Sequence, residues 1–161
     1  MSLEREKLRW NGWGWQNAPD MLGDKAVTVW PWIARTMGMD SLPDTPAIPL
    51  EKIELPRPRL NSRVVAKLKD VLSADRIKTD TFERAFHARG KSYHDLLHLR
   101  SGRLDTAPDA VVYPVSTDEV IGLIQFAMEN NLALTPFGGG SSVVGGVTPL
   151  AGPGHQGVIT V

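Results

Sequence analysis

The sequence contains no cysteine. Disulfide bonds, thiolate metal sites and a cysteinyl link to a cofactor are therefore excluded within this chain. It also lacks an apolar run long enough to span a bilayer, and a leader of the secretory type. Its 18 basic and 18 acidic residues balance, so net charge favours neither nucleic acid nor an anionic membrane as a partner. With 42% hydrophobic and 22% charged residues, the composition is that of a globular protein.

Basic side chains are missing from one long stretch, because no lysine or arginine occurs between Asn131 and Val161. This stretch holds three consecutive glycines followed by two serines, after the apolar run Leu132 to Thr135. Consecutive glycines lose much backbone entropy on folding, and they suit a backbone that curls or that a ligand approaches closely. A curl of successive N–H groups makes an anion-binding concavity. The sequence therefore predicts a phosphate-binding loop that uses neutral donors, with an ordinary surface loop as the alternative.

Two common phosphate loops do not fit this stretch. A P-loop requires a lysine before its serine or threonine, and none is present. The Rossmann fingerprint continues into a helix, whereas Val143 to Pro149 is β-branched, glycine-rich and ends in proline. We therefore expect the loop to bind through its own backbone and not through a helix N-terminus.

The glycine-rich loop resembles the FAD pyrophosphate loop of the vanillyl-alcohol oxidase/p-cresol methylhydroxylase flavoprotein superfamily. More narrowly, the chain resembles the N-terminal part of the alkyldihydroxyacetonephosphate synthase (alkylglycerone-phosphate synthase) family. The narrower resemblance rests on Arg9-Trp10-Asn11-Gly12-Trp13-Gly14 and on Phe86-His87-Ala88-Arg89-Gly90.

The resemblance implies FAD as the cofactor. The residues it assigns to FAD binding are Pro136, Phe137, Gly138, Gly139, Gly140, Ser141 and Ser142. Many relatives in the wider superfamily bond the flavin covalently to a histidine, and Gly140 occupies that place here, so the resemblance implies non-covalent FAD. The family's catalytic residues lie in its C-terminal portion, and no catalytic residue is assigned in this chain.

The resemblance also implies a reaction. Enzymes of this family exchange the acyl chain of acyl-dihydroxyacetone phosphate for a fatty alcohol in ether-lipid biosynthesis, without net redox change. An FAD-dependent oxidase or dehydrogenase of a 2-hydroxy acid or alcohol is the alternative enzyme, and a non-catalytic interaction fragment is a further alternative. Peripheral membrane contact and a homodimer remain open. We expect a cytoplasmic protein, or a peroxisomal one if the source is eukaryotic.

For the fold we expect α+β architecture, with an FAD-binding subdomain of the p-cresol methylhydroxylase type that begins at residue 107. A mostly helical and irregular region, residues 1–106, should precede it and include a proline-rich connector over residues 42–59. That connector either lies over the surface or links two domains flexibly. The apolar run Gly157 to Val161 reads as a strand in the middle of a sheet, so we expect a fragment that is inactive alone.

Periodicity and capping signals predict the individual elements. Pro31 should open a short helix that closes near Gly38, and Asn61 or Ser62 should cap the next one. The further predictions are capping boxes at Asp80/Glu83, Ser92/Asp95 and Ser116/Glu119, strands at Val111–Tyr113 and Leu132–Thr135, and a helical stripe of Val120, Ile121, Ile124, Ala127 and Met128 between these strands. Together they predict a βαβ unit with the glycine loop at a carboxyl end.

Other charged groups carry weaker signals. His94 and His98 have the i, i+4 spacing of a zinc-binding helix, but no third ligand is identifiable, and solvated histidines are favoured. Arg89 and Lys91 either assist an anionic ligand or interact with a helix C-terminus. Arg57, Arg59 and Arg63 read as a solvated basic face.

Overall fold

A computed structural model describes residues 5–19 and 21–161. Within this part, five α-helices and four β-strands alternate with short 3-10 turns. The helices are α1 (Ala26–Thr36), α2 (Ser62–Leu68), α3 (Thr81–Phe86), α4 (Tyr93–Ser101) and α5 (Thr117–Glu129). The strands are β1 (Ile77–Lys78), β2 (Ala110–Val112), β3 (Leu132–Thr135) and β4 (Gly157–Thr160). The expected α+β class is confirmed.

The strands form one sheet in the order β1-β2-β4-β3. Strand β4 pairs in parallel with β2 on one side and with β3 on the other, while β1 pairs antiparallel with β2. All four residues of β4 are buried, so the expected mid-sheet position of this run is confirmed. Strand β4, which comes later in the chain, therefore lies between β2 and β3, the two strands of the βαβ unit that α5 connects. Strand β1 has no counterpart among the sequence-based expectations, because two residues carry no periodicity.

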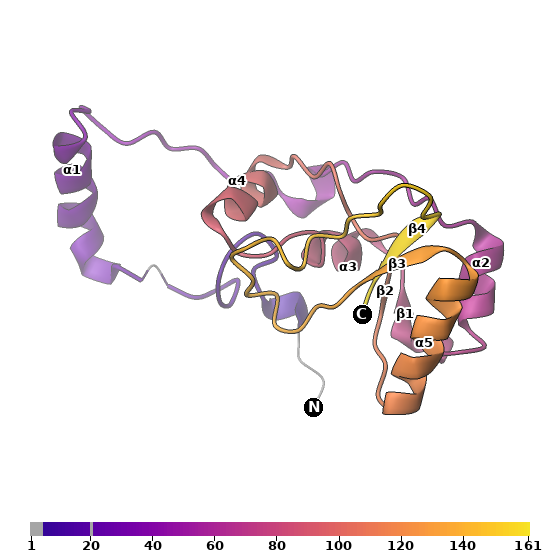
Figure 1. Cartoon of the computed structure of the whole chain (residues 1–161). Coiled ribbons are helices and arrows are strands. Elements are labelled where there is room, and N and C mark those ends of the chain that lie inside the picture. Colours follow the sequence, from indigo (N-terminus) through magenta and orange to yellow (C-terminus); the bar gives the residue numbers. More distant parts are fainter. Residues whose placement is uncertain (1–4, 20) are drawn as a thin grey trace.

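A first hydrophobic cluster joins the sheet to helices α2 and α5, which lie side by side (Figure 1). Leu68 and Leu72 from the α2 region pack with Leu123 of α5 and Ile159 of β4. Asn61 caps α2, its side chain accepting the N–H of Val64 at 2.9 Å. This core crosses residue 107, where we expect the domain boundary, and that boundary stays a prediction.

Helix α5 buries a different face from the one expected. Leu123, Phe126 and Ala127 are its buried residues, whereas Ile121 and Ile124 are 48% exposed and Met128 is 75% exposed. The stripe prediction was therefore wrong except at Ala127. The helix is apolar on both faces, and the sheet covers only the face that carries Leu123 and Phe126.

A second cluster lies beneath α3 and α4. It gathers Trp10, Ile53, Leu99 and Leu104 with small residues of the α3 region. Ile53 belongs to the proline-rich connector, and the N–H of Ile48 in the same connector donates to the carbonyl of Arg100 at 2.8 Å. The connector is thus laid against the body of the chain, as the surface interpretation predicts.

Helix α1 stands away from the rest of the chain as an arm (Figure 1). It begins at Ala26, so the expected start at Pro31 was wrong, and Pro31 lies inside the helix. A proline in this position removes one intrahelical donor, yet the residues before it still form a turn that continues from the 3-10 segment Gly23–Lys25. Gly38 follows the helix with φ +70°, which agrees with the expected end. No helix among the described residues is both long and apolar enough to cross a membrane.

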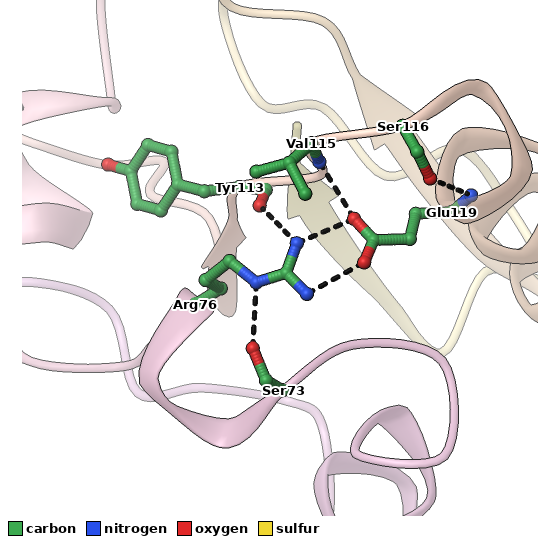
Figure 2. Close-up of polar contacts among 6 residues, drawn as sticks. All are labelled: Ser73, Arg76, Tyr113, Val115, Ser116 and Glu119. Atoms are coloured by element: carbon green, nitrogen blue, oxygen red, sulfur yellow. Dashed lines mark hydrogen bonds and ion pairs between the residues drawn. The ribbon is translucent and has the colours of Figure 1, made fainter. Parts of the chain in front are cut away.

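A bidentate ion pair ties β1 to the start of α5 (Figure 2). Arg76 donates from Nη1 and Nη2 to the two carboxylate oxygens of Glu119 at 2.6 and 2.7 Å. Ser116 caps α5 by accepting the N–H of Glu119 at 3.2 Å, and the same carboxylate accepts the N–H of Val115 at 2.7 Å. The expected capping box is therefore only half formed, because Glu119 is engaged by Arg76. The box at Ser92 and Asp95 is complete.

Candidate functional site

The glycine-rich loop, residues 136–142, follows β3 directly. The N–H of Phe137 donates to the carbonyl of Val161 at 2.7 Å, which fixes the start of the loop to the end of β4. The loop therefore lies at the carboxyl edge of the parallel strands β2, β4 and β3. Ligands of open α/β sheets bind at this edge.

The amide groups of this loop are free to bind a ligand. Among residues 5–19 and 21–161, no partner is found for the N–H groups of Gly138, Gly139, Gly140, Ser141 and Ser142. An ideal Cβ on Gly138 or Gly139 would meet nothing within 4 Å, and both residues are exposed. Successive unpaired N–H groups beside open space form a concavity for an anion.

Gly140 is constrained by the ring beneath it. Its φ is +68°, and a Cβ there would lie 2.6 Å from Cζ of Phe137. Phe137 is held in turn by His87, with ring centroids 4.4 Å apart, and by Phe86, at 6.4 Å. A side chain at position 140 would thus meet both backbone strain and a ring with little room to move. This requirement for glycine disfavours a flavin-bonding histidine at that position.

The two serines differ in what they offer. Ser141 is exposed, and its hydroxyl is available to a ligand. The hydroxyl oxygen of Ser142 accepts the N–H of Gly146 at 3.2 Å, while its carbonyl accepts the N–H of Lys91 at 2.7 Å. Because a serine hydroxyl that accepts one hydrogen bond still has its own O–H to donate, both serines keep a hydroxyl donor for a ligand.

The segment between α3 and α4 supports the loop from behind. An ideal Cβ on Gly90 would overlap the carbonyl oxygen of Ser142, so only glycine allows this approach. Gly90 belongs to the Phe86 to Gly90 motif, which sequence reasoning used for the resemblance but did not place in the site. The glycine at position 90 was the feature of the sequence that could have indicated this contact. Glycine loses more backbone entropy on folding than other residues, so its presence suggests a place where another part of the backbone approaches closely.

Lys91 connects the N-terminal segment that contains Trp10 to the glycine-rich loop. Its ammonium donates to the carbonyl of Trp10 at 3.1 Å and lies 5.8 Å from the centroid of the Phe86 ring. Burial lowers the pKa of Lys91 to about 8, with Asp95 acting in the opposite direction. Trp10 is 7% exposed, whereas Trp13 and Trp15 are 54% and 52% exposed. Of these three tryptophans, Trp10 is the one buried against the body of the chain.

A buried polar cluster lies under Phe137. The hydroxyl of Tyr113 donates to Oε2 of Glu83 at 2.6 Å and lies 3.3 Å from Nε2 of His87. Burial lowers the pKa of His87, against the raising effect of Glu83. Burial and the bond to Glu83 raise the pKa of Tyr113. Because Glu83 is engaged here, the expected box at Asp80 is half formed: Asp80 accepts the Glu83 N–H at 3.0 Å.

The other candidate residues lie outside the loop. Arg89 donates to Oδ1 of Asp105 at 2.7 Å, an ion pair that engages it away from the loop. Nδ1 of His98 lies 3.3 Å from the carbonyl of Arg103, and His94 is exposed. Arg57, Arg59 and Arg63 are exposed. Within the described residues, no group of three or more metal-ligating side chains gathers.

Comparison with known proteins identifies the ligand type. Residues 108–158 match the family model described as FAD binding domain. The alkyldihydroxyacetonephosphate synthase of Trypanosoma brucei brucei is 32% identical over 161 aligned residues, which cover 89% of this chain and 26% of that enzyme. The synthase of Dictyostelium discoideum is 29% identical, covering 91% of this chain and 28% of that enzyme. A mitochondrial D-lactate dehydrogenase [cytochrome] of Arabidopsis thaliana is 31% identical over 83 residues, 51% of this chain.

The fold agrees with these sequence matches. A solved alkyldihydroxyacetonephosphate synthase superimposes with a TM-score of 0.80 at 28% identity, covering 99% of this chain and 32% of the solved one. The chain thus spans about a quarter of the length of the first two synthases, 26% and 28%. Residues 108–158 carry an FAD binding domain sequence, the chain as a whole is related to alkyldihydroxyacetonephosphate synthases, and FAD is the cofactor that these matches indicate.

Proposed function

We propose that this chain forms the cofactor-binding part of an FAD-dependent enzyme of the alkyldihydroxyacetonephosphate synthase type. In this proposal the whole protein exchanges the acyl chain of acyl-dihydroxyacetone phosphate for a fatty alcohol. FAD, when bound, supplies the flavin ring at which the exchange takes place. This chain's own residues hold the diphosphate of the cofactor, and none of them is assigned a catalytic role.

The diphosphate site consists of residues 136–142. Within the part of the chain that the structure describes, the amides of residues 138–142 have no hydrogen-bond partner, and Gly138 and Gly139 leave open space beside the backbone. A diphosphate carries its charge on oxygens that accept hydrogen bonds, so a run of N–H groups satisfies it without a counter-charge. The donor set therefore fits the cofactor. The requirement for glycine at position 140 supports non-covalent attachment.

The extent of the similarity favours the synthase over an oxidoreductase. The synthase match covers 89% of the chain, including its N-terminal half. The D-lactate dehydrogenase match covers 51%. This difference is the single observation that carries the choice of reaction. A D-lactate-type dehydrogenase, which acts on a 2-hydroxy acid, is the second candidate, because such dehydrogenases are also among the relatives of this chain.

The variant Gly139→Val in the full-length protein tests the cofactor site. The Cβ at this position enters open space in the structure, so the fold should be unaffected while the side chain occupies the volume of the diphosphate. We expect a melting temperature within about 2 °C of the wild type without FAD and loss of bound flavin. Thr28→Val is the control, because Thr28 is an exposed residue of the α1 arm, which stands away from the loop.

Two outcomes would reject parts of this proposal. A Gly139→Val protein that purifies with full flavin occupancy would show that the loop does not hold the cofactor. The reaction is tested separately on the wild-type holoenzyme with acyl-dihydroxyacetone phosphate and a labelled fatty alcohol. Label in an ether product supports the synthase, and flavin reduction by D-lactate without exchange supports the second candidate.

A further inference from the structure

Two hydrogen bonds of Lys91 and one contact of its neighbour Gly90 connect segments that are distant in sequence. Its backbone N–H donates to the carbonyl of Ser142 at 2.7 Å. Its ammonium donates to the carbonyl of Trp10 at 3.1 Å, across 81 residues of sequence. Its neighbour Gly90 is in contact with the same Ser142 carbonyl. Lys91 is therefore bonded both to the cofactor loop and to the N-terminal turn.

The N-terminal turn, residues 8–16, is itself an ordered hairpin. Leu8 and Trp15 form an antiparallel bridge, and the N–H of Arg9 donates to the carbonyl of Gly14 at 2.9 Å. Trp10, at the base of the turn, is buried in the second hydrophobic cluster. The Lys91 ammonium thus binds a carbonyl whose own position is fixed.

We propose that Lys91 is a positioning residue for FAD, which locks the carbonyl of Ser142 and couples the N-terminal turn to the cofactor loop. This inference rests on the proposed function and adds the N-terminal turn to the site. The bond to Lys91 turns the Ser142 carbonyl away from the ligand side, since a carbonyl oxygen facing a diphosphate would repel it. The preceding amides then remain directed at the ligand.

The surroundings of the Lys91 ammonium contain few other charges. Asp95, at the start of α4, is the carboxylate that faces it. Arg9, from the N-terminal turn, donates instead to the carbonyl of Ala18 at 2.9 Å, and His87, from α3, is engaged with Glu83. The cofactor loop contributes no titratable side chain, because none occurs from Asn131 to Gly154. Lys91 is therefore bonded to the loop through its backbone N–H, while its ammonium is bonded to the carbonyl of Trp10 in the N-terminal turn.

The position and the pKa of Lys91 predict the direction in which FAD affinity changes with pH. Without ligand, the pKa of Lys91 is about 8 because burial disfavours the charged form. The charged ammonium makes a stronger bond to the Trp10 carbonyl than the neutral amine does, so FAD that stabilises the linked turn and loop also favours the charged form, and its binding takes up a proton above about pH 8. FAD affinity should then fall as pH rises through about 8, by at most about tenfold per pH unit for one proton.

The test measures the FAD dissociation constant of the full-length apoprotein from about pH 6.5 to 9.5. Lys91→Met keeps the length and the backbone N–H but removes the charge. We expect its affinity to be lower by about tenfold at neutral pH, the value of a lost charged hydrogen bond, and to be flat with pH. Lys91→Arg cannot lose its charge in this range, so its affinity should also be flat but remain near the wild-type neutral value.

A second measurement reports on the coupling without flavin chemistry. Trypsin cleavage after Arg9 reports on the N-terminal turn, and cleavage after Arg35, an exposed residue of the α1 arm, serves as an internal control. FAD should slow cleavage at Arg9 in the wild type but not in Lys91→Met. Cleavage at Arg35 should be unchanged in both proteins.

The outcomes separate this inference from the proposed function. A wild-type protein that binds no FAD would reject the proposed function and with it this inference. A wild-type protein that binds FAD with the same pH profile and the same Arg9 protection as Lys91→Met would reject the positioning role alone. The melting temperature of Lys91→Met serves as a check on folding, because the lower desolvation cost of an uncharged side chain opposes the loss of the bond to the Trp10 carbonyl.

Discussion

Gly90 and Ser142 are in backbone contact across 52 residues of sequence, so closely that a Cβ on Gly90 would overlap the Ser142 carbonyl oxygen. Because φ of Gly90 lies outside the left-handed region, the requirement for glycine is steric and not conformational. The contact makes the turn between α3 and α4 part of the cofactor site. It also explains why a glycine closes the Phe86 to Gly90 motif.

The variant Gly90→Ala should disturb the loop from behind. The added Cβ has to displace backbone, and overpacking of this kind costs about 1–3 kcal/mol of stability. We expect at least a tenfold loss of FAD affinity, measured by flavin fluorescence on the full-length protein. The loss should exceed what the drop in stability alone produces, because the amides of the loop shift.

Gly152→Ala is the control for this experiment. Its Cβ would meet only the exposed side chain of His155, at 3.3 and 3.6 Å, and that side chain can move aside. Flavin affinity should be unchanged in this variant. Wild-type affinity in Gly90→Ala would show that the Ser142 carbonyl can move without affecting the cofactor.

The attachment of FAD is predicted to be non-covalent at this loop. Gly140 has φ +68° and no room for a side chain above Phe137, so the position cannot present a reactive histidine. Acid precipitation of the full-length holoprotein should release the flavin into the supernatant, where its absorbance is measured. Flavin retained on a peptide that contains residues 136–142 would contradict this expectation.

His87 should make the protein less stable in mild acid. Burial places its folded-state pKa below the ordinary value of 6.5. The unfolded chain then binds a proton that the folded one does not, so the free energy of unfolding falls as pH drops below about 6.5, by at most about 1.4 kcal/mol per pH unit. The contribution of neutral His87 to the free energy of unfolding is fully present above about pH 6.5. It is lost as the pH falls towards the folded-state pKa of His87.

Thermal unfolding of the full-length protein at about pH 7.5 and about pH 5.5 measures this effect. In His87→Gln, position 87 no longer titrates, so the difference between the two pH values should shrink. His94→Gln, at an exposed position, should leave it unchanged. An equal acid response in the wild type and His87→Gln would assign the loss of stability to other groups.

Local signals in the sequence were sufficient for most elements. The caps at Asn61, Ser92 and Ser116 lie where the side-chain patterns predict them, because a cap acts within three residues of itself. The β3 strand and the loop after it were equally legible, since an apolar run and a glycine cluster are local properties. The residues assigned to the cofactor stay a prediction, supported by unpaired amides.

Other features depend on partners that lie far away in the sequence. The two-residue strand β1 exists because β2 pairs with it. The buried face of α5 is chosen by the sheet and not by the helix's own periodicity, because apolar side chains lie on both of its faces. The half-formed boxes at Glu83 and Glu119 have the same cause: Tyr113 and Arg76 compete for those carboxylates.

The sequence by itself therefore determined the helix starts other than that of α1, the parallel strands and the glycine loop, all features whose energy depends on neighbouring residues. Only the tertiary structure decided that Gly90, Lys91 and Trp10 support that loop. Their contacts cross 51 to 81 residues of chain, from Lys91 to Ser142 and from Trp10 to Lys91. Such contacts form only when packing of the two hydrophobic clusters offsets the entropy of closing loops of that length.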